Sequence, residues 1–199
     1  MTELKRNRIK AVLKYTWPFY IVAAIVAYLV LSFIFNATHQ TPAYKTLTIF
    51  VSGEVTDQKK LRSDILDKYQ DNQLKSFSCI SARITDGNYT TKLTVAGYAS
   101  ADVLILPVSK LDNLSLKTIA IDLQEQLIND YYQGYTFYQQ ESINYGVKID
   151  KGKVNQYMTL PDEDCYMLLN GASKNLGDYS TKPVTEHDNA LRLARDWGM

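Results

Sequence analysis

One short segment in the middle of the chain restricts the possible folds more than any other. Val103–Val108 (VLILPV) carries no polar side chain, and the charged residues Asp102 and Lys110 lie close on either side. The segment between those charges is too short to cross a bilayer. A strand that is apolar on both faces is typical of the centre of a parallel sheet, because helices cover both sides of such a sheet. The segment therefore predicts a buried strand in a folded α/β domain.

The elements before this segment alternate between strand and helix. Leu47–Val51 has the β-branched and aromatic density of a strand, and residues 56–69 place apolar side chains at helical spacing, with Thr56 or Asp57 available to cap the helix. A second strand is predicted at Phe77–Thr85 and a weaker helix at residues 88–100. The order β, α, β, α, β predicts a three-layer, mostly parallel sheet with helices on both faces.

The elements after this segment are shorter. Short strands are predicted at Phe137-Tyr138 and Tyr145–Ile149, and a longer apolar strand at Cys165–Asn170. A closing helix is expected after Asp188, with Leu191 and Trp197 on its buried side.

The amino-terminal part predicts a membrane anchor. No residue from Tyr15 to Ala37 is charged, and Phe19–Phe35 is apolar except for Ser32, which is long enough to span a hydrocarbon core of about 30 Å. The alternative is a cleaved signal peptide, whose apolar run is shorter and ends in a small-residue cleavage site. The length of this run and the absence of a clear A-x-A after it favour the anchor.

Charge predicts the orientation of this anchor. Residues 1–36 carry a net charge of +4 and residues 37–199 a net charge of −3. By the positive-inside rule we expect residues 1–14 in the cytoplasm, a transmembrane helix at 15–37, a stalk at 38–45 and an extracytoplasmic domain at 46–199. The bilayer is thus one expected partner, in a cell membrane crossed once.

Composition and motifs also exclude several classes of function. The net negative domain has no basic cluster, so we expect no nucleic-acid partner. The chain contains no H-E-x-x-H, G-x-S-x-G, P-loop or G-x-G-x-x-G motif, and we expect no enzyme, catalytic residue, cofactor or metal. The acidic run Asp162–Asp164 lacks the spacing of an EF-hand and is interpreted as a solvated loop.

Several segments together resemble a known family. KTLTIFVSG, ASADVLILPVSKL, YGVKID and CYMLLNGASKN, in this order, are similar to the first lobe of extracellular solute-binding proteins of bacterial ABC transporters. The resemblance implies one lobe of a periplasmic-binding-protein fold, in which the Cys165–Asn170 strand returns to the first sheet. Residues 112–160 are too few for a second α/β lobe, so the chain is expected to provide half of a clamp.

The resemblance also implies a location for a site. In such folds ligands bind at the carboxyl ends of the strands. The residues that follow the predicted strands are therefore the candidate ligand-binding residues: Ser52, Gly53, Asp86, Asn88, Tyr89, Ser109 and Asn170. The alternative is that they are ordinary turn residues. A cluster of tyrosines (Tyr131, Tyr132, Tyr135 and Tyr138) is either a stacking or interface surface or half-buried packing.

The implied strand order gives an expectation for the two cysteines. It separates Cys79, on the edge strand, from Cys165, on the returning strand, by two intervening strands. That separation is about 14 Å, beyond the roughly 7 Å reach of a disulfide. We therefore expect two buried free thiols.

These observations predict a membrane-anchored, extracytoplasmic, single-lobe binding or interaction module, accessory to a transporter or another membrane complex. The alternative is a solute receptor of an ABC transporter that forms its clamp by pairing two lobes. A small-molecule ligand belongs to this second hypothesis.

Overall fold

The computed structural model describes residues 3–39, 41–177 and 187–199. The chain divides into two compact units, residues 1–40 and 41–199. The first unit contains one long helix, α1 (Glu3–His39). Lys14–Phe35 within it is long and apolar enough to cross a membrane, with a mean hydropathy of 2.4 and exposed side chains. A secretory signal sequence meets the same criterion.

The second unit is a mixed α/β domain built on a six-stranded sheet. The strands lie in the order β3 (Ser76–Ala82), β1 (Thr46–Ser52), β4 (Val103–Pro107), β8 (Cys165–Leu169), β6 (Ile143–Lys148) and β5 (Phe137–Gln140). β1 pairs in parallel with β3 and β4, whereas β8 is antiparallel to both β4 and β6, and β5 is antiparallel to β6. Four of the six strands therefore point in one direction, which confirms the predicted fold class.

The predicted central strand is confirmed. β4 lies between β1 and β8, and all five of its side chains are buried. Its side chains alternate between two cores, so that Val103 and Ile105 join one while Leu104 and Leu106 join the other. The continuous apolar run is explained by this position, because both faces of the strand are covered.

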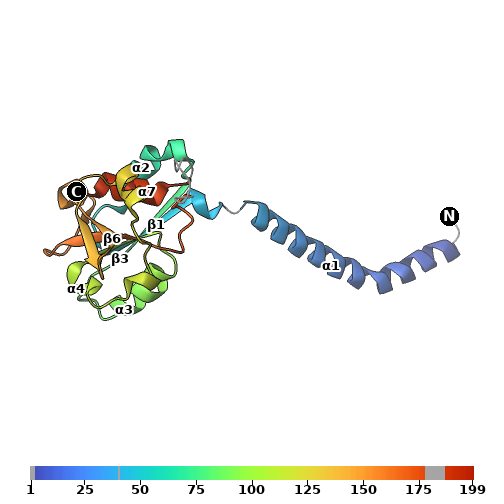
Figure 1. Cartoon of the computed structure of the whole chain (residues 1–199). Helices are drawn as coiled ribbons and strands as arrows, with labels where there is room; N and C mark the ends of the chain where they lie inside the picture. Colours follow the sequence, from blue (N-terminus) through green and yellow to red (C-terminus); the bar gives the residue numbers. More distant parts are fainter. Residues whose placement is uncertain (1–2, 40, 178–186) are drawn as a thin grey trace. The chain divides into compact units, whose positions relative to one another are not determined.

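Helices cover both faces of the sheet, as Figure 1 shows with α2 and α7 on one side and α3 and α4 on the other. The first face packs against α2 (Gln58–Lys68), α5 (Glu125–Tyr131) and α7 (Asn189–Trp197). The second face packs against α3 (Tyr89–Lys92), the π-helical η3 (Leu93–Tyr98), α4 (Val108–Leu111) and η4 (Leu116–Thr118). The domain therefore has three layers and two cores.

The remaining elements are short. Two single-turn segments, η1 (Ala43–Lys45) and η2 (Gln70–Asn72), precede β1 and β3, and α6 (Lys151–Val154) follows β6. β2 (Glu54–Val55) and β7 (Met158–Thr159) form a separate two-stranded antiparallel sheet. Asp57 caps α2 by accepting a hydrogen bond from the Lys60 N–H at 2.9 Å, one of the two caps expected.

The cysteines confirm the expected arrangement. Cys79 lies on the edge strand β3 and Cys165 on the returning strand β8, with β1 and β4 between them. Both are buried free thiols.

Candidate functional site

Most of the predicted site residues gather at one edge of the sheet. We call the edge at which β1, β3 and β4 end the carboxyl edge, and the opposite one the amino edge. Ser52 ends β1 and Gly53 follows it; Asp86, Asn88 and Tyr89 follow β3; and Ser109 follows β4. Because these three strands are parallel, the six residues share the carboxyl edge.

A buried hydrogen bond joins two of these residues. The Ser52 and Tyr89 hydroxyl oxygens lie 2.6 Å apart, and both residues are almost fully buried. Burial raises the pKa of the Tyr89 hydroxyl, and the Lys110 ammonium group lies 5.4 Å from the centre of its ring. Because both side chains are buried, this pair stabilises the packing beneath the carboxyl edge and does not present polar groups on its surface.

Three other predicted residues hold turns together. The Asp86 carboxylate accepts a hydrogen bond from the Arg83 N–H at 3.1 Å, and the Asn88 carbonyl accepts one from the Lys92 N–H at 3.0 Å. Ser109 donates to the Glu163 carboxylate from both its N–H (2.9 Å) and its hydroxyl (2.7 Å). These contacts match the turn interpretation of these residues.

Gly53 borders a cavity of about 280 Å³ at this edge. The cavity is lined by residues at or just after the ends of β1, β3 and β7: Ser52, Gly53, Glu54, Arg83, Ile84, Thr85, Thr159, Leu160 and Pro161. Arg83 and Glu54, both in this lining, form an exposed ion pair. A side chain at Gly53 would put its Cβ 2.4 Å from the Thr159 carbonyl oxygen, so the glycine permits the close approach of β2 and β7.

The prediction that Asn170 joins this rim is wrong. β8 is antiparallel to β4, and Leu169 at its end pairs with Val103 at the start of β4. The carboxyl end of β8 therefore lies at the amino edge. There Asn170 donates hydrogen bonds to the carbonyls of Tyr98 (3.0 Å) and Ala101 (2.7 Å).

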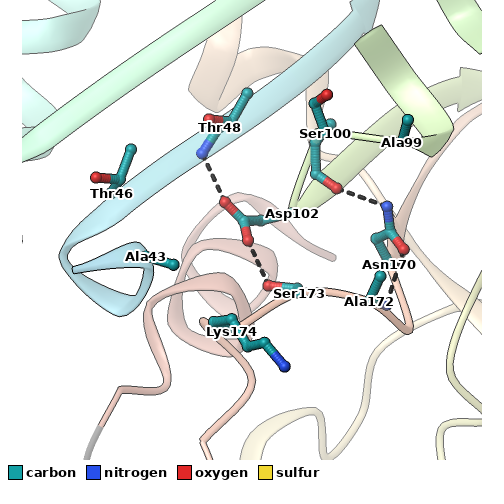
Figure 2. Close-up of a pocket in the computed structure, with 11 residues that line it drawn as sticks. Ala43, Thr46, Thr48, Ala99, Ser100, Asp102, Asn170, Ala172, Ser173 and Lys174 are labelled. Carbon is teal, nitrogen blue, oxygen red and sulfur yellow. Dashed lines mark hydrogen bonds between the residues drawn. The ribbon is translucent and has the colours of Figure 1, made fainter. Parts of the chain in front are cut away.

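A second pocket, of about 330 Å³, lies at this amino edge (Figure 2). Small and polar residues line it: Ala43, Thr46, Thr48, Ala99, Ser100, Ala101, Asp102, Asn170, Ala172, Ser173 and Lys174. Figure 2 shows the Asp102 carboxylate between Thr48 and Ser173. It accepts hydrogen bonds from the Thr48 N–H at 2.7 Å and from the Ser173 hydroxyl. Burial raises the pKa of Asp102, an effect that these hydrogen bonds reduce.

Sequence reasoning missed this pocket. The available signals were an aspartate directly before a buried strand and a polar loop, residues 170–175, directly after another. Their proximity depends on the antiparallel direction of β8, which the apolar pattern of a strand does not encode.

The tyrosine cluster divides between the two faces of the sheet. Tyr132 is fully buried and donates to the Leu191 carbonyl at 3.1 Å, while Tyr131 donates to Asp188 at 2.7 Å. Tyr138 instead packs in the other core, against Tyr166 with ring centres 5.4 Å apart. These tyrosines therefore pack against the domain rather than forming one aromatic surface.

Comparison with known proteins gives weak structural similarity. No family model matches the chain, and no curated protein matches it by sequence. The ABC substrate-binding protein Lmo0181 from Listeria monocytogenes, solved in complex with cycloalternan, overlaps 56% of this chain with a TM-score of 0.33 and 14% identity. RafE from Streptococcus pneumoniae, solved in its apo form, overlaps 59% with a TM-score of 0.32 and 16% identity.

The overlap is partial on both sides. The chain spans about a third of each of these proteins, 32% and 33% respectively. Similarity at this level carries no argument about ligand or mechanism. The class of protein that the geometry itself defines is an α/β domain joined to one apolar helix long enough to span a membrane.

Proposed function

We propose that this chain is a membrane-anchored, extracytoplasmic binding module that contacts a membrane-protein complex, such as a transporter, through the carboxyl edge of its single lobe. One observation carries the proposal. An apolar helix with exposed side chains over Lys14–Phe35 is joined to a separately packed α/β unit. Exposed apolar side chains on a helix of this length are stable in hydrocarbon rather than in water.

The charge distribution supports the orientation. Five cations, among them Lys10 and Lys14, precede or begin the span, whereas residues 37–199 are net negative. Cationic flanks stay on the cytoplasmic side, so the α/β domain lies outside.

The shape of the carboxyl edge supports a macromolecular partner. Its cavity of about 280 Å³ is smaller than most ligand pockets, which enclose about 300–1,000 Å³ and bury most of the ligand. Exposed Arg83 and Glu54 flank the partly buried apolar residues Ile84 and Leu160. An apolar centre with a charged rim is the usual composition of a protein–protein contact.

The test is partner retention by the full chain. The tagged protein, extracted from its own membranes in mild detergent, is expected to retain a membrane-protein complex. Arg83→Glu would place two negative charges side by side at the rim and is expected to reduce the retained partner severalfold. The matched control is Lys117→Glu on η4, an exposed cation. Ala120, just after η4, pairs with Asn170 at the amino edge, away from the proposed contact.

Two outcomes would contradict the proposal. One is equal retention by Arg83→Glu and the control, and the other is no retained complex at all. A receptor made of two paired lobes predicts instead a dimer of this chain that a solute stabilises against heat. That result would replace the accessory role with solute reception.

A further inference from the structure

The pocket at the amino edge holds two opposite charges that are not paired with each other. Asp102 is buried, with only 8% of the residue exposed to solvent. Its described partners are the Thr48 N–H, the Ser173 hydroxyl and the Asn175 side chain, all of them neutral. A buried carboxylate that lacks a cation is costly, because neutral hydrogen bonds replace only part of its hydration. The cost would be offset by a cationic ligand group.

Lys174 supplies the opposite charge on the same pocket. Figure 2 shows its side chain extending away from Asp102, so the two charges line different parts of the cavity. In the described part of the chain, no carboxylate lies within 4.0 Å of the Lys174 ammonium group. An anionic ligand group in the pocket would pair with this ammonium group.

The loop that carries Lys174 is fixed on both sides of it. Ser173 donates to Asp102 and accepts a hydrogen bond from the Asn175 N–H at 3.0 Å. The Asn175 side chain, fully buried, donates to the Thr46 carbonyl at 2.7 Å. Because the loop is already ordered, a ligand would lose little binding free energy to ordering its backbone, which favours binding.

The other walls fit a small polar molecule. Ala43, Ala99 and Ala172 are small, and the polar residues Thr46, Thr48 and Ser100 complete the lining. A volume of about 330 Å³ is at the small end of ligand pockets.

We propose that this pocket binds a small zwitterion, with a primary ammonium group against Asp102 and an anionic group against Lys174. Two sources share this chemistry: a free solute, such as an amino acid or phosphoethanolamine, and the headgroup of phosphatidylethanolamine. The pocket lies at the amino edge, opposite the carboxyl edge that we propose contacts a membrane-protein complex. The two proposals can therefore be tested independently of each other.

The test is calorimetric titration of the full chain in a neutral detergent with glycine and with O-phosphoethanolamine. We expect saturable 1:1 binding of at least one of them. Phosphocholine has no N–H to donate to Asp102 and is expected to bind at least about tenfold more weakly than phosphoethanolamine.

Two variants test the two charges separately. Asp102→Asn keeps an acceptor for the Thr48 N–H and replaces the acceptor of the Ser173 hydroxyl by an N–H that donates to the Ser173 oxygen. It is expected to weaken binding at least about tenfold. Lys174→Ala removes a side chain that has no described partner, so it gives a readout even if Asp102→Asn fails to fold. It is expected to weaken binding severalfold, whereas the control Lys117→Ala is expected to leave it unchanged.

The lipid arm identifies the source. The affinity for phosphoethanolamine is measured with the chain in nanodiscs of phosphatidylethanolamine and in nanodiscs of phosphatidylcholine. A lower apparent affinity in the phosphatidylethanolamine discs indicates that the lipid headgroup competes for the site. Equal affinity in the two indicates a free solute. No saturable binding of glycine or phosphoethanolamine, or unchanged affinity in both Asp102→Asn and Lys174→Ala, would overturn the proposal.

Discussion

Asp102 carries a charge whose burial makes stability depend on pH. Its pKa in the folded domain is raised above the ordinary value of 3.8, chiefly by burial. Between the unfolded and folded pKa values the folded state binds the proton more tightly, so stability falls as pH rises through that window. Asp102→Asn removes the ionisation, keeps the acceptor for the Thr48 N–H and puts an N–H donor against the Ser173 oxygen. We predict that at pH 7 the variant unfolds at the same or a higher urea concentration than the natural chain.

The comparison at acidic pH is the control for this prediction. Below the folded pKa the natural side chain is also neutral, so any advantage of the variant in urea midpoint should shrink. A variant that is less stable by the same amount at both pH values would show that the charge of Asp102 is not what matters.

The two cysteines give a second prediction at the scale of single residues. Burial raises the pKa of Cys79 to about 12 and that of Cys165 to about 11, from 9.0. Since only the thiolate reacts, both should be alkylated at least about a hundredfold more slowly than a free thiol. In denaturant, without reductant, mass spectrometry should find two modified thiols per chain. Fast alkylation of the native protein would contradict the structure. So would thiols that react in denaturant only after a reductant has been added.

The hydrogen bond between Ser52 and Tyr89 gives a third prediction at the scale of single residues. Tyr89→Phe would leave the buried Ser52 hydroxyl without its partner at 2.6 Å. We expect a loss of about 1–3 kcal/mol in the free energy of unfolding. The double variant with Ser52→Ala should lose less than the sum of the two single variants. Additive losses in urea titrations would show that the two hydroxyls are not coupled.

Residue roles were the part of the site least accessible from sequence. Strand ends were recognisable because Gly, Asn and Ser follow apolar runs, and six of seven candidates do share the carboxyl edge. Asn170 was misplaced because an apolar run has the same pattern in either strand direction. The hydrogen bond of Asp102 to Ser173 joins positions 71 residues apart, a proximity that no local pattern encodes.

At the scale of elements, the strands were predictable because burial on both faces requires continuous apolar side chains. β4 and β8 are both runs of this kind. The weak helix after β3 was harder. It continues from α3 into the π-helical η3, where Gly97 approaches the sheet so closely that a Cβ would lie 3.1 Å from the Leu104 side chain. Such packing depends on the partner surface rather than on local propensity.

The β2–β7 pair provides the prediction at this scale. Gly53→Ala would press a methyl group against the Thr159 carbonyl oxygen and is expected to cost about 1–3 kcal/mol of unfolding free energy. Gly87→Ala is the matched control, because nothing lies within 4 Å of the added carbon. Urea midpoints measure both. Equal effects of the two substitutions would mean that β2 and β7 do not approach as the structure describes.

At the scale of the whole molecule, the account depends on which side of the membrane the α/β domain occupies. The most direct measurement is labelling of intact cells with a membrane-impermeant maleimide, using single substitutions Lys75→Cys in the domain and Lys10→Cys before the span. The native thiols are buried and should add little background. The account predicts that Lys75→Cys is labelled in intact cells and that Lys10→Cys reacts only after lysis. Labelling of Lys10→Cys in intact cells, with Lys75→Cys protected until lysis, would contradict it.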